Sequence, residues 1–244
     1  MVLLTTHAVL EQMLTHAHCS HPVEACGMVV SKRGDMTASE VVPFRNQVAS
    51  RVAFQFDPLE QLQVARRLEH QNKVCRVIYH SHTASQAYPS RQDIAYAADP
   101  ALHYLIVSTW DQTQEPIRSF RLSNGTVTEE TISVIDQSVP TVHAIPTHRP
   151  SEQAMSVVVI IPSLFQHLTA ETAKVRVEGA TVAQAIDHLE SQCPGLKNKL
   201  LHDKTVHRFI NIYVNEKDIR FCDGLDTPIE PGDTLTILPA VAGG

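Results

Sequence analysis

Apolar and polar residues along the chain recur at two periods, one typical of helices and one typical of strands. Behind a Thr-Thr start, apolar positions three and four residues apart predict an amphipathic helix over residues 6–18. A second helix is expected over 58–70, because its first residue is a proline, and a third over 90–98. Short apolar or alternating runs predict strands between these helices. The expected strands are 25–31, 37–43, 52–56, 74–82, 103–110, 117–122 and 127–134.

The periodicity stops over residues 136–154, where three prolines lie among Ser, Thr, His and Gln. Such a stretch is typical of a linker, so we expect one domain over residues 1–135 and another over 155–244. Interleaved strands and helices predict an α/β (α+β) fold for the first, with a mixed sheet and flanking helices. In the second, a hairpin, one helix and returning strands are the order of a small β-grasp, ubiquitin-like fold. Its strands are expected at 156–161, 173–177, 209–214 and 234–238, and its helix begins at Thr181.

Composition narrows the classes of function. Of 244 residues, 43% are hydrophobic and 19% are charged, which is typical of a globular protein, and the net charge of -6 argues against nucleic-acid binding. The longest wholly apolar stretch, residues 157–161, is too short to cross a membrane, and the first residues lack the basic-then-apolar order of a signal peptide. We therefore expect a cytoplasmic protein with neither nucleic acid nor membrane as a partner.

The cysteines and histidines bear on metal binding. Five cysteines without a Cys-x-x-Cys pair indicate reduced thiols rather than a disulfide framework or a thiolate zinc site. The 14 histidines leave room for a site built from nitrogen and oxygen ligands.

The segment YHSHTASQAYPSRQD holds the candidate metal ligands. His80 and His82 lie two apart on a predicted strand, where alternate side chains share a face, so both imidazoles can reach one ion. Asp93, one turn into the predicted helix, is the expected third ligand, and a water molecule would complete an open catalytic zinc site. The alternative is that Ser90 and Asp93 are only a helix-capping pair and that the histidines are polar strand ends.

A hydrolytic zinc centre also needs a base near the metal that does not bind it. Glu24, in HPVEACG, is the candidate because it stands at the entry to an apolar strand, where a carboxylate is unusual. The alternative is an ordinary surface glutamate.

Together, Glu24, His80-Ser81-His82, Ser90 and Asp93 resemble the signature of the JAMM, or MPN-plus, metalloproteases over about residues 1–135. The resemblance implies that His80, His82 and Asp93 bind zinc, that Glu24 is the general acid/base and that Ser90 stabilises the oxyanion. It also implies cleavage of a peptide or isopeptide bond after the carboxyl terminus of a ubiquitin-like protein. The segments FQFDPLEQL and HYLIVST are similar to the bacterial enzymes of this family rather than to large deubiquitinases.

The end of the chain, Gly243-Gly244, follows the predicted β-grasp domain. Two residues without a β-carbon can pass through a narrow active-site channel. Residues 155–244 resemble the sulfur carriers of the ThiS and MoaD type, and FINIYVNEKDIRFCDGLDTPIEPGDTLTILPAVAGG is especially similar to a carrier of cysteine biosynthesis. The resemblance implies activation at Gly244 by an E1-like adenylating and sulfurating enzyme, joining to cysteine by a cysteine-synthase-like enzyme, and release by a JAMM hydrolase.

The sequence thus predicts a zinc metallopeptidase fused to its own sulfur carrier, which releases cysteine from a carrier-cysteine adduct. Because the sequence ends at Gly244, we expect a carrier ready for activation. The tail could enter the active site of its own chain, in cis, or that of another, in trans. An alternative function is a general deconjugating isopeptidase for ubiquitin-like modifiers, with the fused domain as a regulatory module or substrate mimic.

Overall fold

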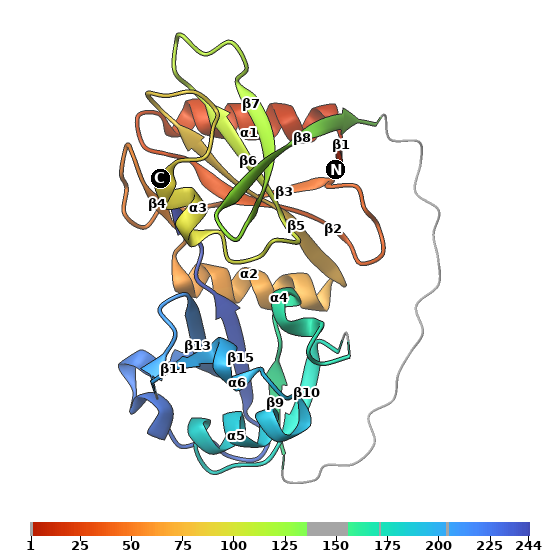
Figure 1. Ribbon diagram of the computed structural model, residues 1–244, viewed down its shortest axis with the longest axis vertical. Helices are drawn as coiled ribbons and strands as arrows, with labels where there is room; N and C mark the ends of the chain where they lie inside the picture. The colour runs from red at the N-terminus through yellow and green to blue at the C-terminus, as the bar shows by residue number, and fades with distance from the viewer. Residues whose placement is uncertain (1, 136–155, 171, 204) are drawn as a thin grey trace. The chain divides into compact units, whose positions relative to one another are not determined.

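A computed structural model describes residues 2–135, 156–170, 172–203 and 205–244. The chain divides into two compact units (Figure 1). The first comprises Met1–Ser138 together with Val241–Gly244, and the second comprises Val139–Ala240. The linker predicted over 136–154 lies outside the described residues.

The first unit is built on a mixed seven-stranded sheet in the order β1-β8-β7-β6-β5-β2-β3. Strands β1 and β8 are parallel, as are β5 and β6, and the remaining neighbours are antiparallel. The strands are β1 (Val2–Thr5), β2 (Cys26–Lys32), β3 (Glu40–Phe44), β5 (Lys73–His82), β6 (His103–Ser108), β7 (Ile117–Ser123) and β8 (Thr126–Val134). A separate short strand, β4 (Phe54–Gln55), pairs with β16 (Ala242–Gly243).

Two long helices pack on opposite faces of this sheet. Helix α1 (His7–Ser20) contributes Met13 to a core that contains Tyr79 of β5. Helix α2 (Pro58–His70) contributes Leu68 to a core that contains Ile78, the next residue of the same strand. Because strand side chains alternate between faces, His80 and His82 point to the face of Ile78, which α2 covers. A short helix, α3 (Arg91–Tyr96), follows the loop after β5.

Gly27 of β2 allows close packing between β2 and β5. A β-carbon at this position would lie 2.5 Å from three atoms of the Tyr79 ring and hydroxyl. The Tyr79 hydroxyl is in turn 2.8 Å from Nδ1 of His16 on α1. The glycine therefore lets a buried tyrosine join β2, β5 and α1.

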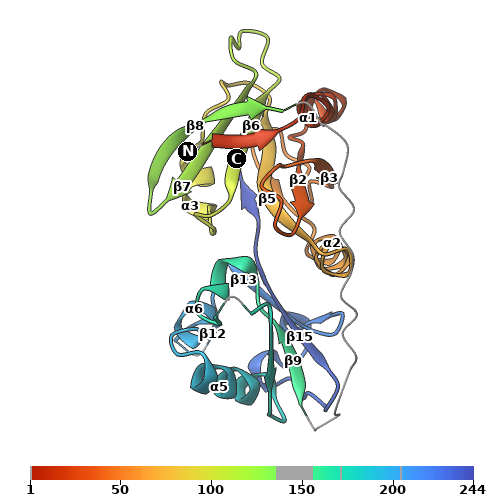
Figure 2. The same cartoon turned by 90° about the vertical axis from the view of Figure 1, so that its right-hand side faces the viewer.

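The second unit has a five-stranded sheet in the order β10-β9-β15-β13-β14, with β9 and β15 parallel at its centre. Helix α5 (Val182–Gln192) contributes its apolar side chains to the core of this unit, and Figure 2 shows it beside the sheet. This arrangement is the predicted β-grasp. The strands are β9 (Val157–Ile160), β10 (Lys174–Val177), β13 (Ile210–Val214), β14 (Lys217–Asp218) and β15 (Thr234–Pro239). Smaller elements are α4 (Ser163–Gln166), α6 (Lys197–Leu200), β11 (Leu201–His202), β12 (Thr205–Val206), and the 3-10 turns Ile219–Phe221 and Gly224–Asp226.

Short elements account for most differences from the sequence-based predictions. Strand β1 was not predicted, because four residues beside a helix show too little alternation. The strand expected over 52–56 is shorter in the structure. Only Phe54–Gln55 form β4, and Phe56 makes an isolated bridge with Asn46. Helix α3 ends at Tyr96, two residues before its predicted end.

Candidate metal centre and active site

The end of strand β5 presents two histidines on one face of the sheet. His80 and His82 are each about 5% exposed, and their Nε2 atoms are 3.1 Å apart. Nδ1 of His82 lies 3.1 Å from the carbonyl oxygen of Gln86 and 3.2 Å from the hydroxyl of Ser85. A proton on Nδ1 donated to the Gln86 carbonyl leaves the Nε2 lone pair of His82 free to bind an ion.

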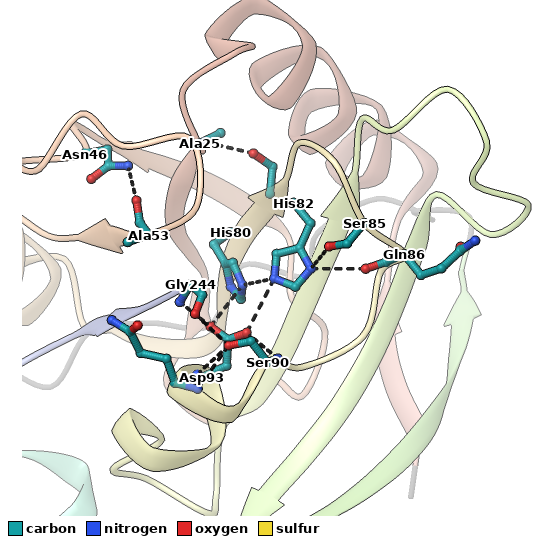
Figure 3. Close-up of polar contacts among 12 residues, drawn as sticks. Ala25, Asn46, Ala53, His80, His82, Ser85, Gln86, Ser90, Asp93 and Gly244 are labelled. Atoms are coloured by element: carbon teal, nitrogen blue, oxygen red, sulfur yellow. Dashed lines mark hydrogen bonds and ion pairs between the residues drawn. The ribbon is translucent and has the colours of Figure 1, made fainter.

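Asp93 reaches the same point from helix α3. Its Oδ1 is 3.2 Å from Nε2 of His80, and its Oδ2 is 3.4 Å from Nε2 of His82. Ser90 and Asp93 also form a capping box, in which the Ser90 amide donates to Asp93 Oδ2 at 2.7 Å. The capping role and the placement beside the histidines thus coexist, because the cap fixes the carboxylate that the histidines face (Figure 3).

The donor set fits a metal ion. His80, His82 and Asp93 are buried and form a group with one ligand atom from each, all mutually within 4.8 Å. Ligands of a tetrahedral zinc ion, each about 2.0–2.1 Å from it, are about 3.3 Å apart, which matches the nitrogen and oxygen separations of this group. Two imidazoles and one carboxylate are also the ligand types that zinc accepts in open catalytic sites.

Burial and mutual contacts shift the pKa values within this group. Burial lowers the pKa of His80. Burial also opposes the charged form of His82, but the hydrogen bond to Asp93 raises its pKa. For Asp93, burial acts upward, yet the His80 and His82 imidazoles hold its pKa well below the ordinary value. The carboxylate is therefore ionised over the whole physiological range and can bind a cation.

Glu24 lies just before β2, close to this group. It is 3% exposed, and among the described residues its Oε2 atom has no hydrogen-bond partner. Burial raises its pKa to about 7, against an opposing effect of His82 and with a further rise from Asp93. Ser81 fixes the neighbouring backbone, since its Oγ accepts from the Ala25 amide at 2.8 Å. A buried carboxylate with a free oxygen and a pKa near neutrality is suited to proton transfer.

The carboxyl-terminal tail reaches the same centre. In the antiparallel pairing of β16 with β4, Ala242 lies opposite Gln55 and Gly243 opposite Phe54. The Gly244 amide donates to Asp93 Oδ1 at 2.8 Å, and the Ser90 hydroxyl donates to the Gly244 oxygen at 2.7 Å. Figure 3 shows Gly244 between Ser90, Asp93 and His80.

Neither of the last two residues has room for a side chain. A β-carbon on Gly243 would lie 2.7 Å from Cε1 of Phe54 and would also overlap Asp93 Oδ1. A β-carbon on Gly244 would overlap Cα of Ala53 and the carbonyl oxygen of Val52, and the φ angle of Gly244 is +127°. Both positions therefore require glycine.

All the predicted site residues lie in the first unit, and the structure brings them together. The predictions did not include Phe54, which lies in the tail-binding strand β4, or Asn46, which lies in the loop before it. Phe54 stacks on His80 with ring centroids 4.5 Å apart, and Asn46 donates to the Glu24 carbonyl at 3.0 Å. The only local signal was the alternation of Phe54 and Phe56, because Asn46 is a common residue type for a turn.

Comparison with known proteins relates the two parts of the chain to two different families. Residues 6–123 match the family of prokaryotic homologues of the JAB domain, and residues 159–244 match the ThiS family. A CysO-cysteine peptidase of Mycobacterium bovis is 40% identical over 136 residues, which are 56% of this chain and 93% of the relative. The sulfur carrier protein CysO of the same organism is 43% identical over 93 residues, which are 37% of this chain and 100% of the relative.

The chain belongs to the prokaryotic JAB family in its first unit and to the ThiS family in its second. A solution structure of a protein from Desulfitobacterium hafniense is similar to the JAB unit, with 34% identity, a TM-score of 0.50, and coverage of 56% of this chain and 94% of that protein. The resemblances to JAMM hydrolases and to ThiS-type carriers, and the expected fold class, are confirmed. No helix within the described part of the chain is long and apolar enough to span a membrane.

Proposed function

We propose that this protein is a zinc-dependent hydrolase that cleaves the bond after Gly244 of a sulfur-carrier tail and so releases cysteine from a carrier-cysteine adduct. The observation that carries the proposal is the position of Gly244, whose oxygen accepts from Ser90 and whose amide donates to Asp93. The names of the two mycobacterial relatives, a CysO-cysteine peptidase and a CysO sulfur carrier, support the same substrate. Residues 1–135 would be the hydrolase, 136–154 the linker and 155–244 the carrier.

His80, His82 and Asp93 are the proposed zinc ligands, since their donor atoms converge and match the spacing of a zinc site. Zinc at this position supplies Lewis-acid polarisation of the scissile carbonyl and activation of water. The chain's own residues supply orientation and proton transfer.

In the adduct, the Gly244 carbonyl carbon is bonded to the amino nitrogen of cysteine. The Ser90 hydroxyl, 2.7 Å from the Gly244 oxygen, donates to that oxygen and stabilises the negative charge that develops on it. Glu24 takes a proton from the attacking water and passes it to the departing amine. The water oxygen forms a bond to the carbonyl carbon, and the carbon–nitrogen bond then breaks, which yields free cysteine and the Gly244 carboxylic acid, whose proton passes to solvent to leave the carboxylate.

The proposal implies two further partners. An E1-like enzyme would adenylate and sulfurate Gly244, and a cysteine-synthase-like enzyme would form the adduct. For either enzyme to use the tail, the contacts of Gly244 with Ser90 and Asp93 must open.

The test is to attach cysteine to Gly244 of the full chain, remove metal, and measure free cysteine after zinc is added. We expect release with zinc, and no release when a chelator replaces it. Glu24→Gln should retain zinc but slow release by roughly 10²–10⁴-fold, because the general base is lost. Glu11→Gln, a change on the exposed surface of α1, is the matched control and should leave the rate unchanged.

Failure of the wild-type protein to release cysteine would refute the proposal. If the same protein instead cleaved lysine-linked conjugates of the ThiS unit, a general deconjugating isopeptidase would be the better description.

A further inference from the structure

Asn46 lies between β3 and β4 and makes four hydrogen bonds through its side-chain amide. Its Nδ2 donates to the Glu24 carbonyl at 3.0 Å and to the Ala53 carbonyl at 2.9 Å. Its Oδ1 accepts from the amides of Val48 and Gln55, both at 3.2 Å. A single planar amide group thus uses two N–H bonds and two lone pairs.

The same loop holds the backbone of Glu24 on both sides. The Glu24 amide donates to the Ser50 carbonyl at 2.9 Å, and the Glu24 carbonyl accepts from Asn46. Because the carboxylate oxygen Oε2 has no partner among the described residues, its position depends on this backbone rather than on bonds of its own. The loop of residues 46–53 therefore holds the backbone of the proposed general base, and Ser81 holds that of the next residue, Ala25.

The other end of this loop leads into the strand that receives the tail. Ala53, which accepts from Asn46, directly precedes Phe54 of β4, and Phe54 pairs with Gly243. The Phe56 amide donates to the Val241 carbonyl at 3.1 Å. Figure 3 shows the Asn46 to Ala53 bond near Gly244.

We propose that Asn46 is a positioning residue that ties the tail-binding strand β4 to Glu24, and so sets the place of the proton-transferring carboxylate relative to the Gly244 carbonyl. The inference rests on the proposed function. The amide chemistry is specific, because an aspartate of the same shape has no N–H and would place a carboxylate oxygen against two carbonyl oxygens. Small misplacements of catalytic groups cost much rate, about 10²-fold for a shift of 1 Å.

The first experiment measures cysteine release from adduct-bearing full chains in which Asn46 is changed to Asp or to Ser. Serine can keep a single donor and is the milder change. We expect the zinc content to be unchanged and the first-order rate to fall by about 10–100-fold in Asn46→Asp and less in Asn46→Ser. Each variant is measured well below its own unfolding midpoint, so that a loss of stability does not lower the rate.

The matched control is Asn215→Ala in the ThiS unit. The Asn215 side chain also pairs on both sides, since it donates to Asp233 at 2.8 Å and accepts from the Thr234 amide at 3.1 Å. This substitution should lower the unfolding midpoint without changing the rate of cysteine release.

The second experiment does not depend on cysteine release. It follows amide hydrogen exchange in the full chain without attached cysteine. If Asn46 holds β4, the amides of residues 54–56 and 241–244 should exchange about tenfold faster in Asn46→Asp than in the wild type. The amides of α5 should keep their exchange rates, because this helix belongs to the other unit.

Release rates within twofold of wild type in both variants would overturn the positioning role. So would a difference from wild type that disappears when both proteins are measured at a lower temperature. Unchanged exchange of the tail would overturn the tie between Asn46 and β4. A wild-type protein that releases no cysteine would refute the proposed function instead, and the exchange result would still decide whether Asn46 holds the tail-binding strand.

Discussion

The backbone of Gly243 and Gly244 lies against Phe54, Ala53 and Asp93 with no space for a β-carbon. In this position a side chain is excluded at two successive residues, and the tail backbone pairs with β4. The Phe54 ring lies against Gly243 and also stacks on the imidazole of His80. A side chain at position 243 would displace a residue that lies against a proposed zinc ligand.

At this scale we predict that Gly243→Ala makes the adduct a poor substrate. The added methyl would overlap Asp93 Oδ1 and Phe54 Cε1, so cysteine release should slow by at least about 100-fold, as expected for a displaced reactive carbonyl. The measurement is the first-order release rate of the full-chain adduct. Ala242→Gly is the matched control one residue earlier, and its rate should stay close to that of the wild type. A Gly243→Ala adduct that is cleaved at the normal rate would contradict this steric account.

At the scale of elements, the first turn of α3 combines a helix cap with the proposed catalytic chemistry. The Ser90 hydroxyl accepts from the amides of Gln92 and Asp93 at 3.1 and 3.0 Å, and it donates to the Gly244 oxygen. One side chain thus stabilises the helix that holds Asp93 and also contacts the carbonyl group of the tail.

We predict that Ser90→Ala separates these two roles. Loss of the cap should lower the free energy of unfolding by about 1 kcal/mol, while loss of the donor should slow cysteine release by about 10²–10³-fold. Asp57→Ala is the matched control, because Asp57 caps α2 by accepting from the amides of Leu59 and Glu60. It should cost similar stability in urea unfolding and little activity. Equal rate losses in the two variants would show that Ser90 acts through stability alone.

In the ThiS unit, Glu190 of α5 binds the backbone that connects α5 to α6. Its carboxylate accepts from the Gly195 amide at 2.8 Å and from the Lys197 amide at 2.7 Å. These two hydrogen bonds hold the pKa of Glu190 below its ordinary value of 4.5, and the one from Gly195 has the larger effect. A depressed carboxylate pKa stabilises the folded state above the unfolded pKa, and this contribution is lost as the pH falls through the folded pKa.

We therefore predict that Glu190→Gln destabilises the ThiS unit at neutral pH by up to about 1 kcal/mol, since the residue is only partly buried and solvent screens its charge. The difference between wild type and variant should shrink as the pH falls below 4.5. Urea unfolding followed by circular dichroism at neutral and acidic pH measures this difference. A difference that stays constant with pH would rule out ionisation of Glu190 as its cause.

At the scale of the whole molecule, the tail belongs structurally to the JAB unit although it follows the ThiS unit in the chain. Residues Val241–Gly244 group with Met1–Ser138, whereas the preceding residue, Ala240, groups with the ThiS unit. A tail that is covalently joined to the enzyme it enters has an effective concentration of about the millimolar range.

We predict that hydrolysis occurs in cis. The first-order rate constant for release from the adduct should not change when the protein is diluted, because substrate and site share one chain. In a second experiment, an adduct-bearing Glu24→Gln chain is mixed with an equal amount of wild-type protein that carries no adduct. Release should be slow, since the wild-type site is occupied by its own tail. A rate that rises in proportion to protein concentration would establish action between chains.

The sequence by itself determined the order of the main elements, the two families, and the placement of His80 and His82 on one strand face. These features depend on neighbouring residues, whose spacing directly sets periodicity and direction. Position along the chain made Asp93 and Glu24 candidates, and the motif resemblance gave roles to Glu24, Ser90 and Asp93, but neither showed the way that their atoms meet.

Only the tertiary structure decided what surrounds these residues. The Asp93 carboxylate and the Gly244 amide are separated by 151 positions in the chain, and Asn46 and Glu24 by 22. Such contacts follow from sheet pairing and loop hydrogen bonds, which leave no periodic trace in the sequence. The requirement for two glycines likewise comes from the walls formed by Phe54, Ala53 and Asp93, and a tail sequence alone does not specify the walls it will meet.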